Sequence, residues 1–175
     1  MYTLPAAGLW TVDLTSTTAS FEVSNFFVNR VPGTLAVRSG AVRTDDQGRP
    51  TTIEAVLDAA SIATGNARRD KDLRSARFLD VAEHPEMRYT GSTVSATEEG
   101  GWTVTGSLVV GGCEAPMDLE VSLRRSSVAG TLQVVARGTV DRAAAGIKAP
   151  SFMIGRHVDV TIDAVLSLTP AHVEA

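Results

Sequence analysis

Apolar and polar residues alternate over most of this chain. The clearest stretch, residues 117–124, reads Met-Asp-Leu-Glu-Val-Ser-Leu-Arg. Successive side chains of a β-strand point to opposite faces, so this pattern gives a strand one apolar face and one polar face. A chain built mainly from such stretches must form a sheet that buries one face against an interior. The alternation therefore predicts an all-β protein.

The same period of two recurs along the chain, and polar or glycine-containing turns separate the stretches. A turn is expected at Asn29–Gly33, and a longer connection at Asp141–Ile154. Strands joined by short turns pair antiparallel, and closing the sheet removes its exposed edges. We therefore predict an antiparallel β-barrel of about eight strands. The predicted strands cover residues 9–14, 17–29, 34–44, 51–61, 87–97, 102–110, 117–124, 132–140 and 157–168.

Small residues on the predicted apolar face favour a barrel over a sandwich. A sandwich fills its interior from two facing sheets, usually with bulky side chains. A closed sheet of about eight strands is wide enough to hold one small ligand. The small inward residues favour such a cavity, and the alternative is tight local packing around them. They are Ala55, Ala59, Gly91, Gly106, Ala136, Gly138 and Ala164.

One long segment, residues 61–87, interrupts the alternation and is rich in charge. Asn66 can cap a short helix over residues 67–75, because an Asn side chain accepts a hydrogen bond from the first helical turn. We therefore predict a short helical insertion, at residues 66–84, that covers the sheet. The apolar side chains that it offers to the sheet are Leu73, Phe78, Leu79 and Val81.

A second, shorter turn is expected before the next strand. Asp80, with Glu83 three residues later, resembles a capping box. Pro85 disfavours helical geometry at His84, so residues 81–84 have room for about one turn. Asp80, Glu83 and His84 also resemble metal ligands, but no second histidine lies nearby in the sequence, and we predict no metal site.

Length and charge narrow the classes of function. The chain has 175 residues and a formal net charge of -4, which suits one domain over residues 1–175 with a frayed tail at residues 170–175. The most basic segment, residues 68–77, is interrupted by acidic residues, so we do not expect nucleic-acid binding. The single Cys113 cannot form an internal disulfide, and no partner base can be named for it as a nucleophile.

The sequence shows neither a signal peptide nor a membrane span. Residues 1–8 lack a basic region followed by an apolar region. No apolar run approaches the length of a membrane-spanning helix. If no leader precedes this sequence, we expect a soluble, cytoplasmic protein.

Three polar residues suggest functional roles. Arg69 and Asp70 are neighbours in the predicted helix and point in different directions, so they cannot act as one catalytic pair. We expect Arg69 or Asp70 to hydrogen-bond backbone groups at strand ends and to pin the insertion over one mouth of the barrel. Asn25 shares a face with Phe21 and Val23. It would therefore offer a polar handle to a ligand inside the barrel, or else bond to neighbouring backbone.

The chain resembles the YceI-like family nearly end to end. The central signature, Ser-Ile-x-Thr-Gly, then Arg-Asp-x-x-Leu, then Phe-x-Asp and a Pro, is met within residues 61–85. The chain departs from the family's pattern at Ala145, where an aromatic residue is usual, and at Cys113, where many members carry Val, Ile or Thr. Further matching positions are Trp10, Asp13, Phe21, Val23, Asn25, Val31, Gly33, Leu108, Gly112, Arg142 and Gly146.

The resemblance implies an extended lipocalin-like barrel that binds a long apolar molecule, with polyisoprenoids and isoprenoid quinones as the usual ligands. No cofactor is implied beyond such a bound lipid or quinone, and a homodimer stays open. The expected lid residues are Arg69, Asp70 and Leu73. The expected ligand contacts are Phe21, Val23, Asn25, Leu57, Phe78, Met87, Val104, Leu108, Leu119, Val121, Val160 and Ile162.

Our first hypothesis is a cytoplasmic carrier or sequestering protein for such a lipid. The alternative is a small barrel enzyme that cyclises or isomerises an apolar polyene by shape, without a recognisable catalytic motif. A third hypothesis is an interaction protein whose barrel is only a scaffold, which an exposed apolar groove without a lumen would indicate. Because no catalytic residue can be named, we favour binding over catalysis.

Overall fold

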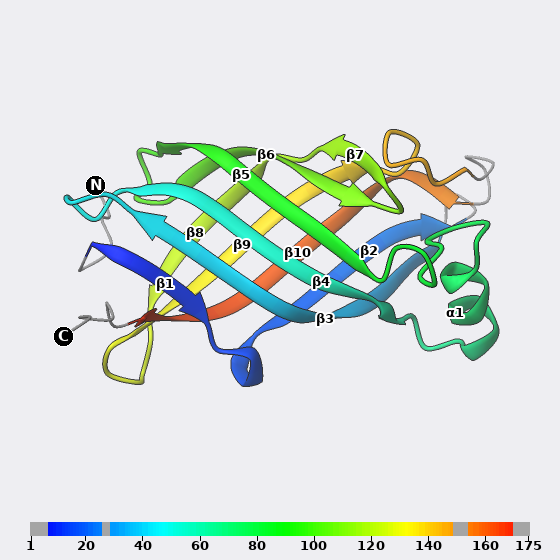
Figure 1. The fold of residues 1–175 in the computed structure, drawn as a ribbon, viewed down its shortest axis with the longest axis horizontal. Helices are drawn as coiled ribbons and strands as arrows, with labels where there is room; N and C mark the ends of the chain where they lie inside the picture. Colours follow the sequence, from blue (N-terminus) through cyan, green and yellow to red (C-terminus); the bar gives the residue numbers. More distant parts are fainter. Residues whose placement is uncertain (1–6, 26–28, 149–153, 170–175) are drawn as a thin grey trace.

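In the part of the chain that the structure describes, ten strands form one antiparallel sheet that curves around an interior (Figure 1). The computed structural model describes residues 7–25, 29–148 and 154–169. The tail predicted at residues 170–175 lies outside the described residues. The strands are β1 (Gly8–Val12), β2 (Thr18–Asn25), β3 (Asn29–Thr44), β4 (Pro50–Ala63), β5 (Glu86–Ala96), β6 (Trp102–Val110), β7 (Cys113–Pro116), β8 (Leu119–Arg125), β9 (Thr131–Asp141) and β10 (Ile154–Thr169).

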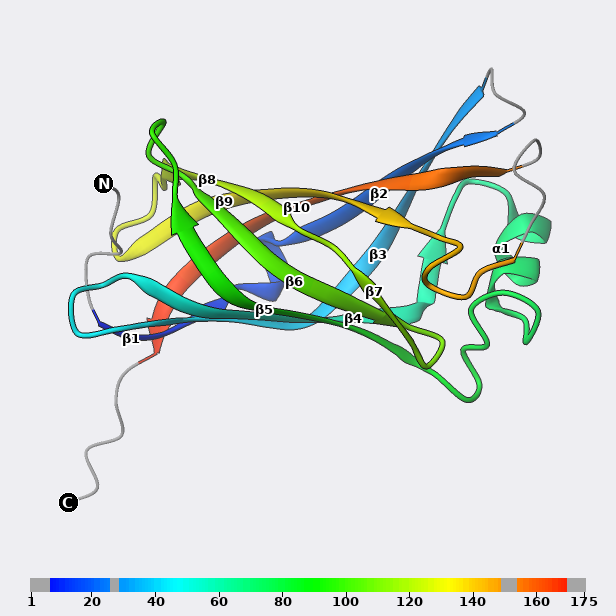
Figure 2. The same cartoon turned by 90° about the horizontal axis from the view of Figure 1, so that it is seen from above.

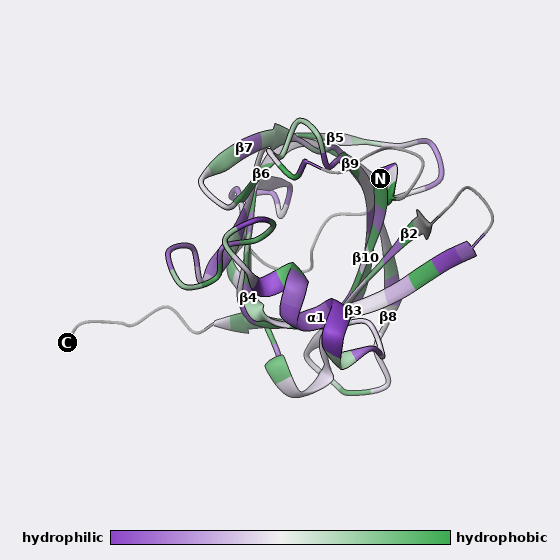
Figure 3. Ribbon diagram, turned by 90° about the vertical axis from the view of Figure 1, so that its right-hand side faces the viewer, coloured by the Kyte–Doolittle hydropathy of each residue, from purple (hydrophilic) through white to green (hydrophobic). Residues whose placement is uncertain are grey.

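The last strand closes the sheet. β10 pairs with β9 along one side and with β1 and β2 along the other, so that Val160 lies opposite both Gly138 and Phe21. β1 and β2, separated by a 3-10 turn at Leu14–Ser16, share one position, since both also pair with β3. β7 and β8 share another position beside β6. The strands therefore occupy eight positions of a closed barrel, seen end-on in Figure 3, and the predicted fold class is confirmed.

Helix α1 (Ala67–Arg74) lies in the insertion between β4 and β5. As predicted, the side chain of Asn66 caps it and accepts a hydrogen bond of 3.0 Å from the backbone N of Arg69. The backbone N of His84 donates to the carbonyl oxygen of Asp80, which closes the expected second turn. The capping box is wrong, because Asp80 has a φ of 49°, whereas an N-cap residue is extended. Among the described residues, no helix is long and apolar enough to cross a membrane.

The end of the barrel opposite α1 is where β1 and β8 lie (Figure 1), and large side chains are buried there. Trp10 is 3% exposed and Trp102 is 2% exposed. Val104, Leu119 and Val121 are buried around them. Full burial of one such aliphatic side chain contributes about 1.5–3 kcal/mol to the stability of the fold. This end therefore forms the hydrophobic core of the barrel.

Two glycines on the interior face mark close packing rather than open space. A Cβ atom at Gly106 would lie 2.5 Å from the carbonyl oxygen of Thr90 and would overlap the ring of Tyr89. A Cβ atom at Gly138 would lie 2.8 Å from Cδ2 of Leu119. Neighbouring groups therefore occupy the space that a side chain would need. At both positions, tight local packing is the better explanation of the small residue.

β3 and β10 begin well before their predicted limits. β3 begins at Asn29 and pairs with β2 in regular register, with Gly33 opposite Phe21, so the turn predicted at Asn29–Gly33 is wrong. The glycine that suggested a turn instead leaves room for the aromatic ring across the strand pair. β10 likewise begins at Ile154, earlier than predicted.

Replacing Gly106 with Ala is expected to lower the free energy of unfolding by about 1–3 kcal/mol, because the new Cβ would press on Thr90 and Tyr89. Urea unfolding followed by circular dichroism measures this change. Thr105→Ala, on the exposed face of the same strand, is the control and should change the free energy by less than about 0.5 kcal/mol. An unchanged free energy of unfolding of Gly106→Ala would show that the neighbouring groups of the barrel wall shift enough to make room for the Cβ atom.

Candidate functional site

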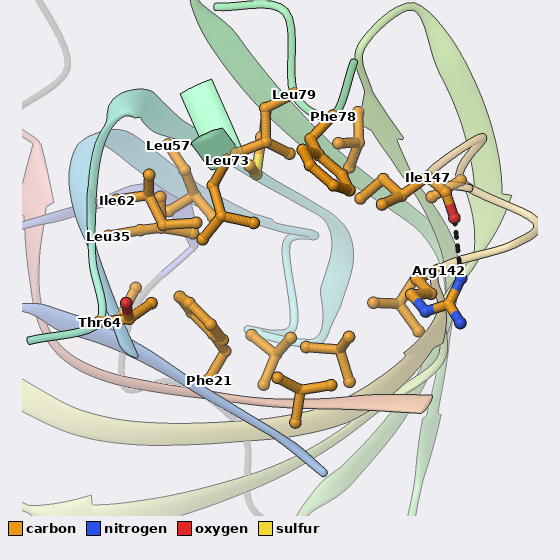
Figure 4. A pocket seen from close by; sticks show the side chains of 18 of the residues that line it. Phe21, Leu35, Leu57, Ile62, Thr64, Leu73, Phe78, Leu79, Arg142 and Ile147 are labelled. Carbon is orange, nitrogen blue, oxygen red and sulfur yellow. Dashed lines mark hydrogen bonds between the residues drawn. The ribbon is translucent and has the colours of Figure 1, made fainter. Parts of the chain in front are cut away.

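Side chains leave the interior unfilled at the α1 end of the barrel. A cavity of about 500 Å³ lies there, between the strands and the insertion. Hydrocarbon side chains form most of its wall and point inward, as Figure 4 shows for Phe21, Leu35, Leu57 and Leu73. Small-molecule sites usually measure roughly 300–1,000 Å³, so the cavity has the size of a ligand site.

Most of the predicted ligand contacts line this cavity. Within one strand they are spaced by two residues, so their side chains point to the same face. Barrel closure then brings together positions that are far apart in the sequence, such as Phe21 and Val160. The predicted contacts in the wall are Phe21, Val23, Leu57, Phe78, Met87, Leu108, Val160 and Ile162.

Three predicted contacts lie in the filled end instead: Val104, Leu119 and Val121. They face the interior, but none of them is in the cavity wall. Val104 is fully buried and packs against the backbone of Gly91. Alternation determines which face a residue occupies and says nothing of its level along the barrel axis. We therefore reassign these three residues from the ligand site to the core.

The polar handle predicted at Asn25 stays a prediction, because the side chain of Asn25 lies outside the described residues. The backbone of Asn25 is opposite Asn29 in β3 and Ile154 in β10. Ile154 lines the cavity, so this strand end lies close to the cavity wall.

Tyr89 brings a hydroxyl group into the apolar wall. Its side chain is buried, and the hydroxyl donates a hydrogen bond of 3.0 Å to the carbonyl oxygen of Met117. Burial raises the pKa of Tyr89 to about 12, because the phenolate would lose its solvation, and the charge of Asp118 adds to the effect. The hydroxyl oxygen keeps lone pairs that can accept a bond from a ligand. Sequence reasoning missed Tyr89, although it follows Met87 by two residues on the same face.

Other wall residues were also missed by sequence reasoning. Leu35 and Ile62 line the cavity, and Ile62 stands in the central signature at residues 61–85, which was the available signal for it. Ile147 lines it from the turn after β9, where no periodicity marks an inward position. Ala145 is buried in the same turn and lines the wall with a small side chain where the family usually has an aromatic one.

A buried arginine holds the turn that carries Ile147. Arg142 is 4% exposed, and its Nη1 donates to the carbonyl oxygen of Ile147 at 3.0 Å (Figure 4). Its Nη2 donates to the carbonyl oxygen of Ile154 at 2.7 Å, and its Nε to that of Gly155 at 3.0 Å. These oxygens carry partial negative charge and replace the water lost by the guanidinium. Arg142 thus joins the end of β9 to the start of β10 at the cavity wall.

Thr64 links the end of β4 to α1. Oδ1 of Asp70 accepts a hydrogen bond of 3.0 Å from the backbone N of Thr64 and one of 2.5 Å from its hydroxyl. Nε of Arg69 donates to the same hydroxyl at 2.8 Å, and Nη2 of Arg69 donates to the carbonyl oxygen of Thr64 at 2.8 Å. Asp70 is buried, so little water competes for these bonds. The structure thus shows both residues bound to a strand end.

Arg74 attaches α1 to β4 a second time. Its Nε donates to the carbonyl oxygen of Ala60 at 2.8 Å, and its Nη2 to that of Ile62 at 2.9 Å. Sequence reasoning missed this residue, because a surface arginine near a helix end is common. Leu73, predicted as part of the lid, lines the cavity beneath these bonds. The insertion therefore forms one wall of the cavity.

Groups able to hold a metal ion are sparse in the described part of the chain. There, no cluster of three or more His, Cys, Asp or Glu side chains has a suitable arrangement. Cys113 is a free, exposed thiol outside the cavity wall. The arrangement of the site is suited to holding hydrocarbon.

Asp70→Ala is expected to lower the free energy of unfolding by about 1–3 kcal/mol, because Thr64 loses the acceptor of two hydrogen bonds. Melting temperature and urea unfolding measure the effect. Asp72→Ala, an exposed position of the same helix, should change stability by less than about 0.5 kcal/mol. The pinning role of Asp70 would be refuted if Asp70→Ala kept both the melting temperature and the retention of a bound ligand.

Stability is also expected to fall as the pH rises from about 10 to about 12. Tyrosine ionises near pH 10 in an unfolded chain, whereas burial raises the pKa of Tyr89 to about 12. The folded state therefore holds the proton more tightly, so this contribution is complete below about pH 10 and is lost across the window. Tyr89→Phe should show a smaller fall in urea unfolding experiments. Equal falls in both proteins would contradict the raised pKa.

Comparison with known proteins identifies the family of this fold. The model of the YceI-like domain matches residues 10–166. The UPF0312 protein YE1254 of Yersinia enterocolitica is 37% identical over 82 residues, which are 46% of this chain and 42% of that protein. Protein YceI of Salmonella newport is 31% identical over 106 residues, which are 59% of this chain and 54% of that protein. The chain thus spans about half the length of the curated relatives it matches.

Solved structures share the barrel at low sequence identity. BcnA of Burkholderia cenocepacia has a TM-score of 0.77 at 17% identity, over 88% of this chain and 98% of that one. A polyisoprenoid binding domain from Saccharophagus degradans has a TM-score of 0.72 at 16% identity, over 91% of this chain and 98% of that one. These likenesses show the fold. Because the family model covers residues 10–166, the protein belongs to the YceI-like family.

Proposed function

We propose that the protein binds a long apolar lipid, a polyisoprenoid or an isoprenoid quinone, in the barrel cavity and acts as its carrier or sequestering protein. The observation that carries this proposal is the cavity of about 500 Å³ with its wall of hydrocarbon side chains. The Saccharophagus degradans neighbour is described as a polyisoprenoid binding domain, which supports the same ligand class for this barrel.

Hydrocarbon burial is sufficient for tight binding. Each buried methylene contributes about 0.8 kcal/mol, so one five-carbon isoprene unit contributes about 3 to 4 kcal/mol before the ordering cost of the ligand. A few units therefore reach a useful affinity without an ionic contact. An apolar wall is thus what such a ligand requires.

The distribution of polar groups suggests how the lipid is oriented. Asn66, Arg68 and Asp72 line the cavity from α1, at the outer end of the barrel. At the other end of the cavity, the wall continues into the packed core around Val104. The apolar tail would lie toward the core, and a polar head group would stay near α1.

Ala55→Trp is expected to weaken lipid binding strongly, because Ala55 lines the cavity and a Trp side chain there would occupy space that the ligand needs. The measurement is native mass spectrometry of the purified protein, followed by solvent extraction and lipid analysis. The control is Ala36→Trp, at an exposed position of β3, which should retain the lipid of the parent protein.

The outcome separates binding from catalysis. Recovery of one lipid class unchanged from the parent protein, and its loss from Ala55→Trp alone, would support the carrier role. A supplied polyene that the parent protein converts into a new compound would contradict a pure binding role. Lipid retained equally by both variants would place the ligand outside the cavity.

A further inference from the structure

The cavity opens between α1 and the start of β3. Pairing of β3 with β4 ends at Thr34 and Ala63, so residues 29–33 of β3 pair only with β2 among the described strands. Val31 lines the cavity from the β3 side of this gap, and Arg68 lines it from the α1 side. Figure 2 shows β2 and β3 diverging from α1 at this end of the barrel. One side of the mouth is therefore a strand pair, and the other is the helix.

The helical side of the mouth is basic, although the whole chain is acidic. Residues 67–77 contain five basic and two acidic residues, a formal charge of +3, whereas the chain carries -4. Figure 3 shows α1 as a hydrophilic segment at the open end of the ring. A positive segment on a negative protein directs that segment toward anionic partners.

Not all of these charges are available to a partner. Arg69, Asp70 and Arg74 form the hydrogen bonds that attach α1 to β4. Arg68 and Lys71 are exposed, and the ion pairs of the described residues do not include them. Asp72 is also exposed at this rim and offsets one positive charge.

Arg77 places a third cation beside a hydrocarbon side chain of the cavity wall. Its guanidinium carbon lies 5.5 Å from the centre of the Phe78 ring, and Phe78 lines the cavity. Arg77 is exposed, whereas Phe78 is half-buried. Cations next to apolar side chains suit the boundary between lipid head groups and acyl chains.

We propose that the α1 face of the mouth, formed by Arg68, Lys71 and Arg77, docks on an anionic lipid surface. This inference rests on the proposed function, since it supplies the place where an apolar ligand passes between a lipid phase and the cavity. Each basic residue near an anionic surface strengthens binding by about fivefold. Three such residues should strengthen it by about 100-fold.

Co-sedimentation with vesicles tests the docking surface. The full chain should bind vesicles of phosphatidylcholine mixed with phosphatidylglycerol and should bind vesicles of phosphatidylcholine alone far more weakly. The triple variant Arg68→Gln, Lys71→Gln, Arg77→Gln should lose about 100-fold in binding to the anionic vesicles. Added salt should weaken the parent protein's binding, because the Debye length falls to about 3 Å at 1 M.

A matched variant controls for net charge. Arg43, Arg124 and Arg137 are exposed on β3, β8 and β9 and form no ion pair among the described residues. Their triple replacement by Gln removes the same charge and should leave vesicle binding within about twofold of the parent protein. Equal losses in the two triple variants, or equal binding to both vesicle types, would overturn the docking surface.

Retinol, a fluorescent polyene, separates this proposal from the proposed function. The double variant Lys71→Gln, Arg77→Gln, which leaves every side chain that lines the cavity in place, should bind retinol as the parent protein does. If retinol fails to bind the parent protein while the anionic vesicles still do, the cavity proposal fails and the docking surface stands. If retinol binds and the anionic vesicles do not, the docking surface alone is refuted.

Discussion

Closure of the sheet by β10 is the constraint on which the rest of the structure depends. Because β10 bonds to β9 and also to β1 and β2, the strands form a ring of eight positions. A ring of this size is just wide enough for side chains to fill it or for one ligand to occupy it. At each position along the barrel axis, the size of the inward side chains then determines whether the interior is filled or open.

Trp10 and Trp102 are buried at one end of the barrel. The stability that their burial contributes offsets the cost of leaving the other end unfilled. Trp10 of β1 lies opposite Leu168 of β10 and Val42 of β3, where the first and last strands meet. Large apolar burial therefore stabilises closure at that end. At the α1 end, wall side chains lack partners on one side and lose dispersion contacts. A hydrocarbon ligand would restore these contacts, so under the proposed function the same unfilled space supplies the binding free energy.

Sequence could predict the fold class and the inward face of most strands, because alternation is a local rule that most of the strands obey. It did not predict β7 or the first residues of β3. It could not separate core from cavity. Val104 and Leu108 lie four residues apart on one face of β6, yet the first is core and the second lines the cavity. Their level is set by packing across strands, where Gly106 admits the ring of Tyr89. Local chemistry likewise revealed the cap at Asn66, but no sequence pattern marked the bonds of Arg142 to the carbonyl oxygens of Ile147, Ile154 and Gly155.

The hydrogen bonds that hold the insertion join residues that are closer in the sequence than the strand pairs that close the barrel. Thr64 binds Asp70 six residues away, and Arg74 binds Ala60 fourteen residues away. Barrel closure instead joins β10 to strands near the other end of the chain. Breaking the local hydrogen bonds between α1 and β4 would therefore widen the mouth, while every strand pair of the ring stays formed. Because local opening of this kind costs less free energy than global unfolding, the insertion can move without loss of the barrel.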